Sequence, residues 1–395
     1  MKMAAEIAGI ELRDSQSSFS DSKKKEFFEK FDSIPMPKEK DGDWRYTDIS
    51  KLDFKKFLPI SAKAKIFTSS PDEDLSGQGV VLTDINSAFE KYAFAREYFS
   101  KEIGAENDKL IALNCSYFNH GYFLYVPENV EVKRPVRIEI NLGDRTGVMH
   151  NMVVAGRGSK IDVIEEFSNR EIQEEQFNSC VARISAGEGS KINFYHTNKF
   201  TKNVYSFVSA FGFLERDSEM NWICGCFGGK LNRLKIETIF RGEGSQCSNL
   251  GIFMGKGREH IDFTTNMHHE ALSTTNNVLV DGILKDESTS VYRGLIKIEK
   301  HAQKTNSYLA NHILKLGDKT LANSIPSLKI DANDVKASHG ATVGQIDEEH
   351  LFYLMARGLS REQAESLVVE GFFEPVIQKI PLEDIRERIR EIIRE

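Results

Sequence analysis

The sequence predicts a mainly β protein whose core is either a β-helix or a stack of short-stranded sheets, with helical segments before and after it. Short stretches of alternating apolar and polar residues recur between residues 131 and 335, where long helical patterns are absent. Glycine turns of one formula also recur there at a nearly regular spacing. We therefore divide the chain into an N-terminal α/loop domain (1–130), a β core (131–345) and a C-terminal helical domain (346–395).

The N-terminal domain mixes helix and loop. Ser22–Ile34 has aromatic and aliphatic residues at helical spacing, and Pro35 ends that predicted helix. The compact aromatic segment Asp43–Asp48 follows it. Asp84–Ile103 again has the pattern of a helix.

In the β core, four stretches alternate with a period of two residues, which indicates strands with one buried and one solvated face. They are Val136–Ile140, Lys160–Ile164, Lys191–Tyr195 and Leu234–Phe240.

The turns that begin at Gly156, Gly187 and Gly242 share a Gly-x-Gly-Ser formula, and each lies next to a strand. The first two are 31 residues apart, and the next gap of 55 residues has the turn-like Arg216–Glu219 near its middle. The resulting period of about 27–31 residues is typical of solenoids and arrays. Glycine is favoured at such corners because it adopts positive φ without steric cost.

Three helices are predicted after residue 346. Asp347 can cap the first, and Gly358 can end it in a left-handed conformation. Ser360–Gln363 is a capping box that opens the second helix. Pro381 fits the first turn of the third, on which Asp384 and Arg388 are one turn apart and can pair.

Charge and composition exclude several classes of protein. The net charge is -7 and the only basic run is Lys23–Lys25, so the chain lacks the positive stripe that nucleic acid or an anionic membrane demands. No apolar run reaches the ~20 residues of a membrane span, and the N-terminus is too short and acidic for a signal peptide. Five irregularly spaced cysteines indicate free thiols. We expect a cytoplasmic protein.

The sequence lacks the motifs of common catalytic sites. The glycine turns have neither the third glycine nor the following helix of a dinucleotide site, and no phosphate loop or Gly-x-Ser-x-Gly elbow occurs. We expect a protein without enzymatic activity.

His339 lies in Ser338–Thr342, a string of small residues that predicts a turn between strand-like sequence and the first C-terminal helix. A neutral imidazole suits iron, and small neighbours leave this one accessible. His339 can therefore be a metal ligand at a subunit interface, or a hydrogen-bonded histidine that holds the turn.

Other candidate ligands have simpler explanations. Cys224 and Cys226 share one face of a strand, but the chain has no second cysteine pair, which favours buried thiols. His260 and Asp262 share a face, whereas the adjacent His268 and His269 point opposite ways. Hydrogen bonding along a β ladder explains this set better than a metal site does.

The C-terminal helices carry aromatic and arginine residues that are enriched at interface centres. These residues form either a small helical core or a partner-binding surface. The candidates are Phe352, Tyr353, Arg357, Gly358, Phe372 and Phe373.

Three blocks of the sequence resemble the SufB/SufD family of iron–sulfur cluster assembly proteins, and above all its SufD subfamily. They are Trp44–Asp48, Pro326–Val335 and the stretch Ile330–Gly358 that contains Ser338-His339-Gly340-Ala341-Thr342. The resemblance runs from about residue 35 to residue 380. It implies a right-handed parallel β-helix with helical N- and C-terminal domains.

The resemblance also implies a function. The chain would be a non-catalytic scaffold that pairs with SufB, docks the ATPase SufC through its C-terminal helices, and places His339 at a transient iron–sulfur cluster between subunits. No cofactor would be bound stably.

Two departures from the family pattern bear on this assignment. Gly340 follows His339 where SufB has a glutamate, which favours SufD, and Ala337 replaces a cysteine that SufD chains often carry. Two alternatives stay open: a homodimeric scaffold in a simplified system, and a β-helix enzyme acting on polysaccharides, which normally needs paired carboxylates.

Overall fold

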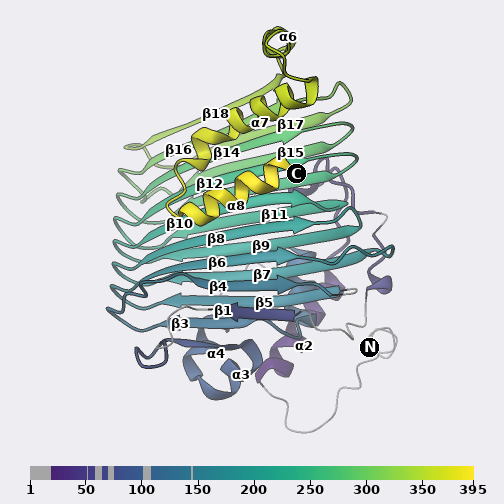
Figure 1. Cartoon of the computed structure of the whole chain (residues 1–395). Coiled ribbons are helices and arrows are strands. Elements are labelled where there is room, and N and C mark those ends of the chain that lie inside the picture. The colour runs from purple at the N-terminus through teal and green to yellow at the C-terminus, as the bar shows by residue number, and fades with distance from the viewer. Residues whose placement is uncertain (1–18, 51, 58–64, 70–74, 101–107, 144–145) are drawn as a thin grey trace.

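The computed structural model describes residues 19–50, 52–57, 65–69, 75–100, 108–143 and 146–395. In this part of the chain, two nine-stranded sheets face each other and form a parallel β-solenoid, so the predicted fold class is confirmed (Figure 1). The first sheet contains, in order of pairing, β1 (Lys65–Ser69), β4 (Val136–Asn141), β6 (Lys160–Ser168), β8 (Lys191–Phe200), β10 (Glu219–Gly228), β12 (Gln246–Gly255), β14 (Thr275–Leu284), β16 (Asn306–Lys315) and β18 (Lys336–Gln345).

The second sheet contains β2 (Val81–Asp84), β3 (Tyr122–Val126), β5 (Thr146–Ala155), β7 (Gln176–Ala186), β9 (Val204–Leu214), β11 (Leu231–Phe240), β13 (His260–His269), β15 (Thr289–Ile298) and β17 (Leu321–Ile330). From β3 onward the chain alternates between the sheets, so each coil gives one strand to each. The predicted period is the sequence distance between paired residues on successive coils: Lys160 pairs with Lys191, Lys191 with Glu219, and Glu219 with Gln246.

The predicted glycine turns stack at one corner of the solenoid. Gly158, Gly189 and Gly244 have φ of 66°, 62° and 75°. Asp217, in the turn between those of Gly189 and Gly244, occupies the same position with φ of 53°. Each turn bonds the next coil through its backbone, for example from Gly158 N to Glu188 O at 2.8 Å. The corner thus needs left-handed residues at a fixed spacing, which is why the formula recurs in the sequence.

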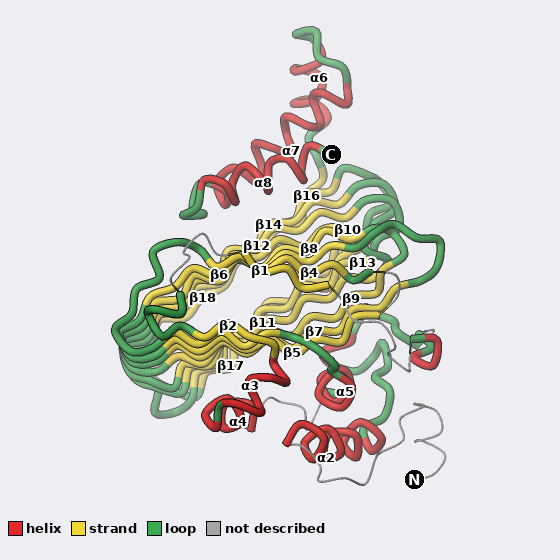
Figure 2. Tube along the Cα trace, turned by 60° about the horizontal axis from the view of Figure 1, so that its bottom comes forward, coloured by secondary structure: helices red, strands yellow, loops and turns green. Residues whose placement is uncertain are grey.

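The space between the sheets is filled by alternate side chains of each strand, including Ile192, Trp222, Phe253 and Tyr292. Helices cover the two outer faces, as Figure 2 shows. The N-terminal α2 (Phe19–Ser33), α3 (Ile85–Lys91), α4 (Ala93–Ser100) and α5 (Lys109–Tyr117), with the short 3-10 turns η1 (Gly42–Trp44) and η2 (Phe54–Lys56), lie on the sheet that contains β5 to β17. The C-terminal α7 (Arg361–Ile377) and α8 (Glu383–Arg394) pack on the other sheet.

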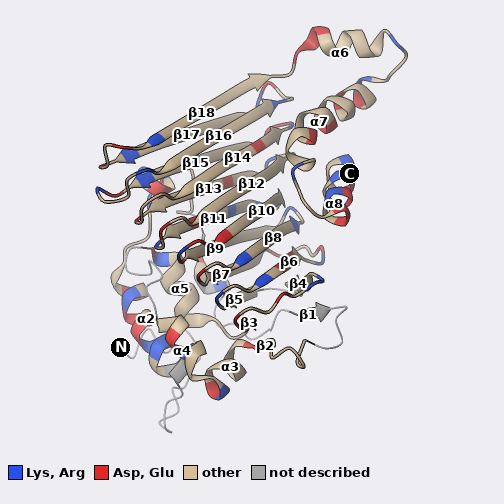
Figure 3. Ribbon diagram, turned by 90° about the vertical axis from the view of Figure 1, so that its left-hand side faces the viewer, with Lys and Arg blue, Asp and Glu red and all other residues tan. Residues whose placement is uncertain are grey.

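The two ends of the solenoid differ. At the first end, β1 and β2 run antiparallel to their neighbours β4 and β3 and close the sheets. These strands belong to the sheets although their residues lie within the first 130. At the other end, β17 and β18 each pair with a single described strand, and α6 (Glu348–Met355) extends beyond them (Figure 3).

The C-terminal caps are confirmed, and one predicted ion pair is wrong. Asp347 caps α6, Gly358 has φ of 97°, and Ser360 forms the capping box of α7. Asp384 pairs with Arg137 of β4 rather than with Arg388, because α8 lies across the sheet and turns this side chain toward it. Pro381 precedes the N-cap residue of α8 instead of lying in its first turn.

Two local expectations also change. Tyr92 interrupts the helix expected over Asp84–Ile103, so the described residues form α3 and α4, while positions 101–103 fall outside them. The turn expected at Ser338–Thr342 is the middle of strand β18, because this segment pairs in parallel with β16 over its whole length.

Candidate functional site

His339 lies in the middle of the last strand at the open end of the solenoid. Its register partner on β16 is Leu309. The same column of register partners continues through Val278 on β14 and Asn249 on β12 to Trp222 on β10. Leu309, Val278 and Trp222 are fully buried between the sheets, so His339 continues an inward-facing column. It is exposed because no further coil of the described chain covers it.

The surface around His339 is apolar and uncovered. We call it the open end and define it by six of the inward-facing residues of the last coil: Leu328 and Ile330 on β17, and Ala337, His339, Ala341 and Val343 on β18. Leu328 is 38% exposed and Val343 is 46% exposed, whereas their neighbours one rung below, Ile296 and Ile313, are buried. The open end therefore exposes the kind of apolar side chains that are buried between successive coils in the rest of the core.

The edge strand β18 has little protection against pairing with another chain. Proteins guard exposed edges with charged residues, prolines or covering segments. In β18, Lys336 is the single formally charged residue, and the following residues are mostly small. An edge of this kind is suited to accept a strand from a partner.

His339 forms no metal site with the other described residues of its own chain. The described residues contain no group of three or more His, Cys, Asp or Glu side chains that could hold a metal ion. They also provide no hydrogen-bond partner for the His339 ring, so the alternative of a histidine that holds a turn has no support in this geometry. A metal at His339 would therefore need ligands from outside the described part of this chain.

The cysteines are buried, as the sequence analysis favoured. All five are free thiols within the described residues. Cys224 and Cys226 point into the solenoid from β10, and burial raises the pKa of both thiols well above its ordinary value. A protonated, inaccessible thiol is a poor nucleophile and a poor metal ligand.

The histidines of β13 take part in hydrogen bonds rather than in a metal site. His260 Nδ1 lies 2.7 Å from Thr289 Oγ1, and His268 Nε2 lies 2.9 Å from Glu299 Oε1. His269 stacks on Phe240 with ring centroids 4.2 Å apart. The interpretation as a β-ladder network therefore fits these residues.

Asp262 has a structural role that the sequence did not reveal. Its carboxylate is completely buried and accepts hydrogen bonds from Thr47 Oγ1 and from Arg293 Nη1, both at 2.6 Å. Arg233 Nη1 lies 3.6 Å from the same carboxylate. Burial alone would raise the pKa of Asp262, but the two guanidinium groups and Thr47 outweigh it and hold the pKa below its ordinary value.

These bonds attach an N-terminal segment to the outer face of the second sheet. The guanidinium of Arg233 lies 3.8 Å from the ring centroid of Trp44 and donates to Asp43 O. Arg293 donates to Arg45 O as well as to Asp262. The aromatic segment Asp43–Asp48 is therefore a strap held by a buried ionic network.

We predict that stability falls as the pH drops from 7 to 5, partly through His269. Burial lowers the pKa of its imidazole to about 4, so the folded state excludes a proton that the unfolded chain binds near pH 6.5. The stability that the neutral ring contributes is complete above pH 6.5 and is lost as the pH falls toward 4, by about 2 kcal/mol between pH 7 and pH 5. Urea unfolding at both values measures it. In a His269→Gln variant, the decrease in the free energy of unfolding between pH 7 and pH 5 should be smaller than in the wild type by about 2 kcal/mol. An identical decrease in both proteins would contradict the assignment to His269.

The aromatic candidates of the C-terminal helices separate into exposed and buried residues. Phe352 and Tyr353 on α6 are 73% and 57% exposed, and the guanidinium of Arg357 lies over the Tyr353 ring, next to the turn at Gly358. Phe373, by contrast, is completely buried against the sheet under α7.

Phe373 must therefore be removed from the candidate partner surface, because its ring packs within its own chain. Phe372 on the same helix is half-buried at the edge of that core. The exposed candidates are confined to α6 and the turn that follows it. None of the described helices is long and apolar enough to cross a lipid bilayer.

Two family models and several curated proteins match this sequence. Residues 139–372 match the family model described as "SUF system FeS cluster assembly, SufBD core domain", and residues 62–138 match "SufBD protein N-terminal region". The iron-sulfur cluster assembly protein SufD of Bacillus subtilis is 28% identical over 92% of this chain and 91% of its own length. A SufBD family protein of Staphylococcus epidermidis is 28% identical over 85% of this chain and 73% of its own length.

Proposed function

Because this chain belongs to the SufBD family of iron–sulfur cluster assembly proteins and is a homologue of SufD, we propose that it is a non-catalytic scaffold subunit of a SufBCD-type complex. In this proposal the open end pairs with a SufB-like paralogue, and a SufC-like ATPase docks on the C-terminal helices. His339 faces the joint between the two scaffolds. The iron–sulfur cluster is assembled at this interface and then passed on, so it is a substrate of the complex and not a resident cofactor.

The observation that carries the proposal is the uncovered last coil. It combines two strand edges that pair with no further described strand with the apolar side chains of Leu328 and Val343, whose counterparts in the preceding coil, Ile296 and Ile313, are buried. A partner with a similar solenoid would bury these side chains and continue the backbone hydrogen bonds. A second copy of this chain could do the same, which is the homodimeric alternative in an organism that has no separate paralogue.

His339 supports a role in handling the cluster. Its ring is exposed in the middle of the apolar surface, and the described residues form no group of three or more metal-ligating side chains around it. A partner that covers the open end would enclose the imidazole in a region with few water molecules. Neutral imidazole is a suitable iron ligand, and groups from the partner would complete the site.

The C-terminal helices support docking of an ATPase. Helix α6 extends beyond the solenoid and presents Phe352 and Tyr353 to solvent, while α7 and α8 are fixed to the sheet below. Exposed aromatic residues next to an arginine are typical of interface centres. Movement of a bound ATPase would then be transmitted through α7 to the rungs next to the open end, as a rigid-body change at an interface.

We predict that His339→Ala leaves folding and complex formation intact but lowers cluster assembly by about tenfold or more. Loss of a solvent-exposed imidazole removes no buried contact, so the thermal midpoint should stay near that of the wild type. The test is reconstitution with the co-purified partners of the native host, followed by the visible absorption of the cluster. His301→Ala, at an exposed corner, is the matched control; equal cluster yields in both variants would refute the role of His339.

A further inference from the structure

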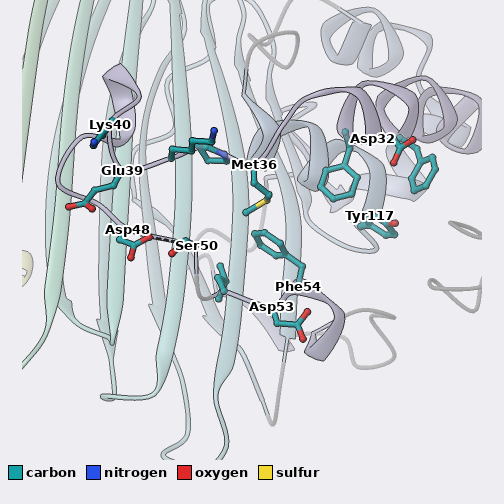
Figure 4. A pocket seen from close by; sticks show the side chains of 14 residues that line it. Asp32, Met36, Glu39, Lys40, Asp48, Ser50, Asp53, Phe54 and Tyr117 are labelled. Atoms are coloured by element: carbon teal, nitrogen blue, oxygen red, sulfur yellow. Dashed lines mark hydrogen bonds between the residues drawn. The ribbon is translucent and has the colours of Figure 1, made fainter.

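A groove with an aromatic floor lies beside the N-terminal helices, and neither the open end nor the C-terminal helices include it. Its volume is about 850 Å³. One wall comes from α2, the other from residues 36–40, 48, 50 and 52–54, and Tyr117 of α5 completes it (Figure 4). We call this feature the acidic groove.

The floor of the acidic groove is apolar and well supported. Phe28, Phe31 and Tyr117 contact one another, with ring centroids 6.1–6.4 Å apart. All three rings are half-buried, as are Met36 and Phe54, which pack against the core beneath the helices. A concave surface of this size and lining is typical of a binding site. Aromatic residues and methionine are also enriched at the centres of protein interfaces.

The rim has an excess of negative charge. Four exposed carboxylates, those of Asp32, Glu39, Asp48 and Asp53, line the groove together with two lysines. Burial and the charge of Asp32 raise the pKa of the Tyr117 phenol, which lies in the same groove. The Lys109 ammonium already lies 4.3 Å from the centroid of the Phe31 ring. A further cation over the Phe28 and Tyr117 rings would be attracted both by the carboxylates and by the ring faces.

We propose that the acidic groove binds a partner protein through a basic amphipathic segment, with apolar side chains on the aromatic floor and lysine or arginine at the rim. The groove is too small for a domain but admits several side chains. Helix α2, which forms one wall of the groove, lies at the opposite end of the molecule from α6 (Figure 1), so we expect the groove to stay accessible when the open end and the C-terminal helices are occupied. It would thus serve a component other than the two that the proposed function requires.

The test is fluorescence anisotropy with a labelled helical peptide that has leucines on one face and lysines on the other. We expect saturable binding to the full chain that weakens with salt. A double variant, Asp32→Lys with Glu39→Lys, should bind this peptide about tenfold more weakly, because two attractive contacts become repulsive. Both side chains are exposed, so the variant should fold normally.

Matched controls separate this site from general charge effects. Glu188→Lys with Glu243→Lys makes the same change in net charge at exposed corners of the solenoid and should alter the peptide affinity by less than twofold. A control peptide with glutamates in place of the lysines should not bind. Equal weakening by both double variants, equal binding of both peptides, or no saturable binding would overturn the proposal. A change in the mass of the unliganded protein on groove substitution would assign the groove to self-association instead.

Discussion

Replacing Asp262 by alanine should lower the free energy of unfolding by about 3–5 kcal/mol, the range found when one partner of a buried ion pair is removed. The carboxylate is fully buried and bonds Thr47 and Arg293, with Arg233 close by. Without it, two guanidinium groups remain in a dry environment with no counter-charge. The strap would also lose the bond from Thr47, so the N-terminal segment should detach from the sheet. Urea denaturation at neutral pH measures the change.

The control for this prediction is Glu299→Ala, at the residue that follows β15 of the same sheet. Glu299 pairs with Lys297 and His268 near the surface, where water replaces a lost ion pair at little cost. Its loss should have a much smaller effect than the loss of Asp262. Similar destabilisation in both variants would show that burial of the Asp262 network does not determine its contribution.

The fold could be predicted because its signals are local and repeated. Each coil needs the same left-handed residue at the same corner, so the formula at Gly156 returns at Gly187 and Gly242, with the Asp217 turn between the last two. The helix caps at Asp347 and Ser360 are equally local, since the capping atoms lie within three residues of each other. Signals of this kind can be read from short windows of sequence.

The contacts that join distant segments could not be predicted in this way. Thr47 and Asp262 are separated by 215 positions, and Arg137 and Asp384 by 247. Helical spacing alone suggested that Asp384 would pair with Arg388, but the packing of α8 on the sheet decided the outcome. Similarly, Phe352 and Phe373 look alike in sequence, and only the docking of α7 shows that the second is core.

The candidate site was found in the sequence, but its geometry was not. The small residues around His339 suggested a turn, because glycine and serine favour turns. The pairing with β16 instead makes the segment an edge strand. Because His339 is in register with the buried Leu309, it occupies an inward-facing position between the two sheets. The small residues therefore shape a strand that another chain can approach closely.

The second large effect is expected at the open end. Replacing Leu328 and Val343 by glutamate should weaken binding of a SufB-like partner, or of a second copy, by about a hundredfold or more, while the isolated chain stays folded. Both side chains are at least 38% exposed in the monomer, so water can solvate the new carboxylates there. In the proposed complex they would be buried without partners, which costs several kcal/mol. Sedimentation of the mixed proteins measures the loss.

Leu321→Glu provides the matched control, because Leu321 is 64% exposed and lies on β17 at an outward-facing position opposite Thr289. This substitution adds one carboxylate, where the double variant adds two, to the edge strand that carries Leu328, without placing it between the stacked coils. We therefore expect it to leave the affinity within a fewfold of the wild type. If Leu321→Glu were as harmful as the pair at Leu328 and Val343, the partner would bind the outer face of the sheet. If neither change mattered, no partner would stack on the last coil, and His339 would have no second subunit with which to share a cluster.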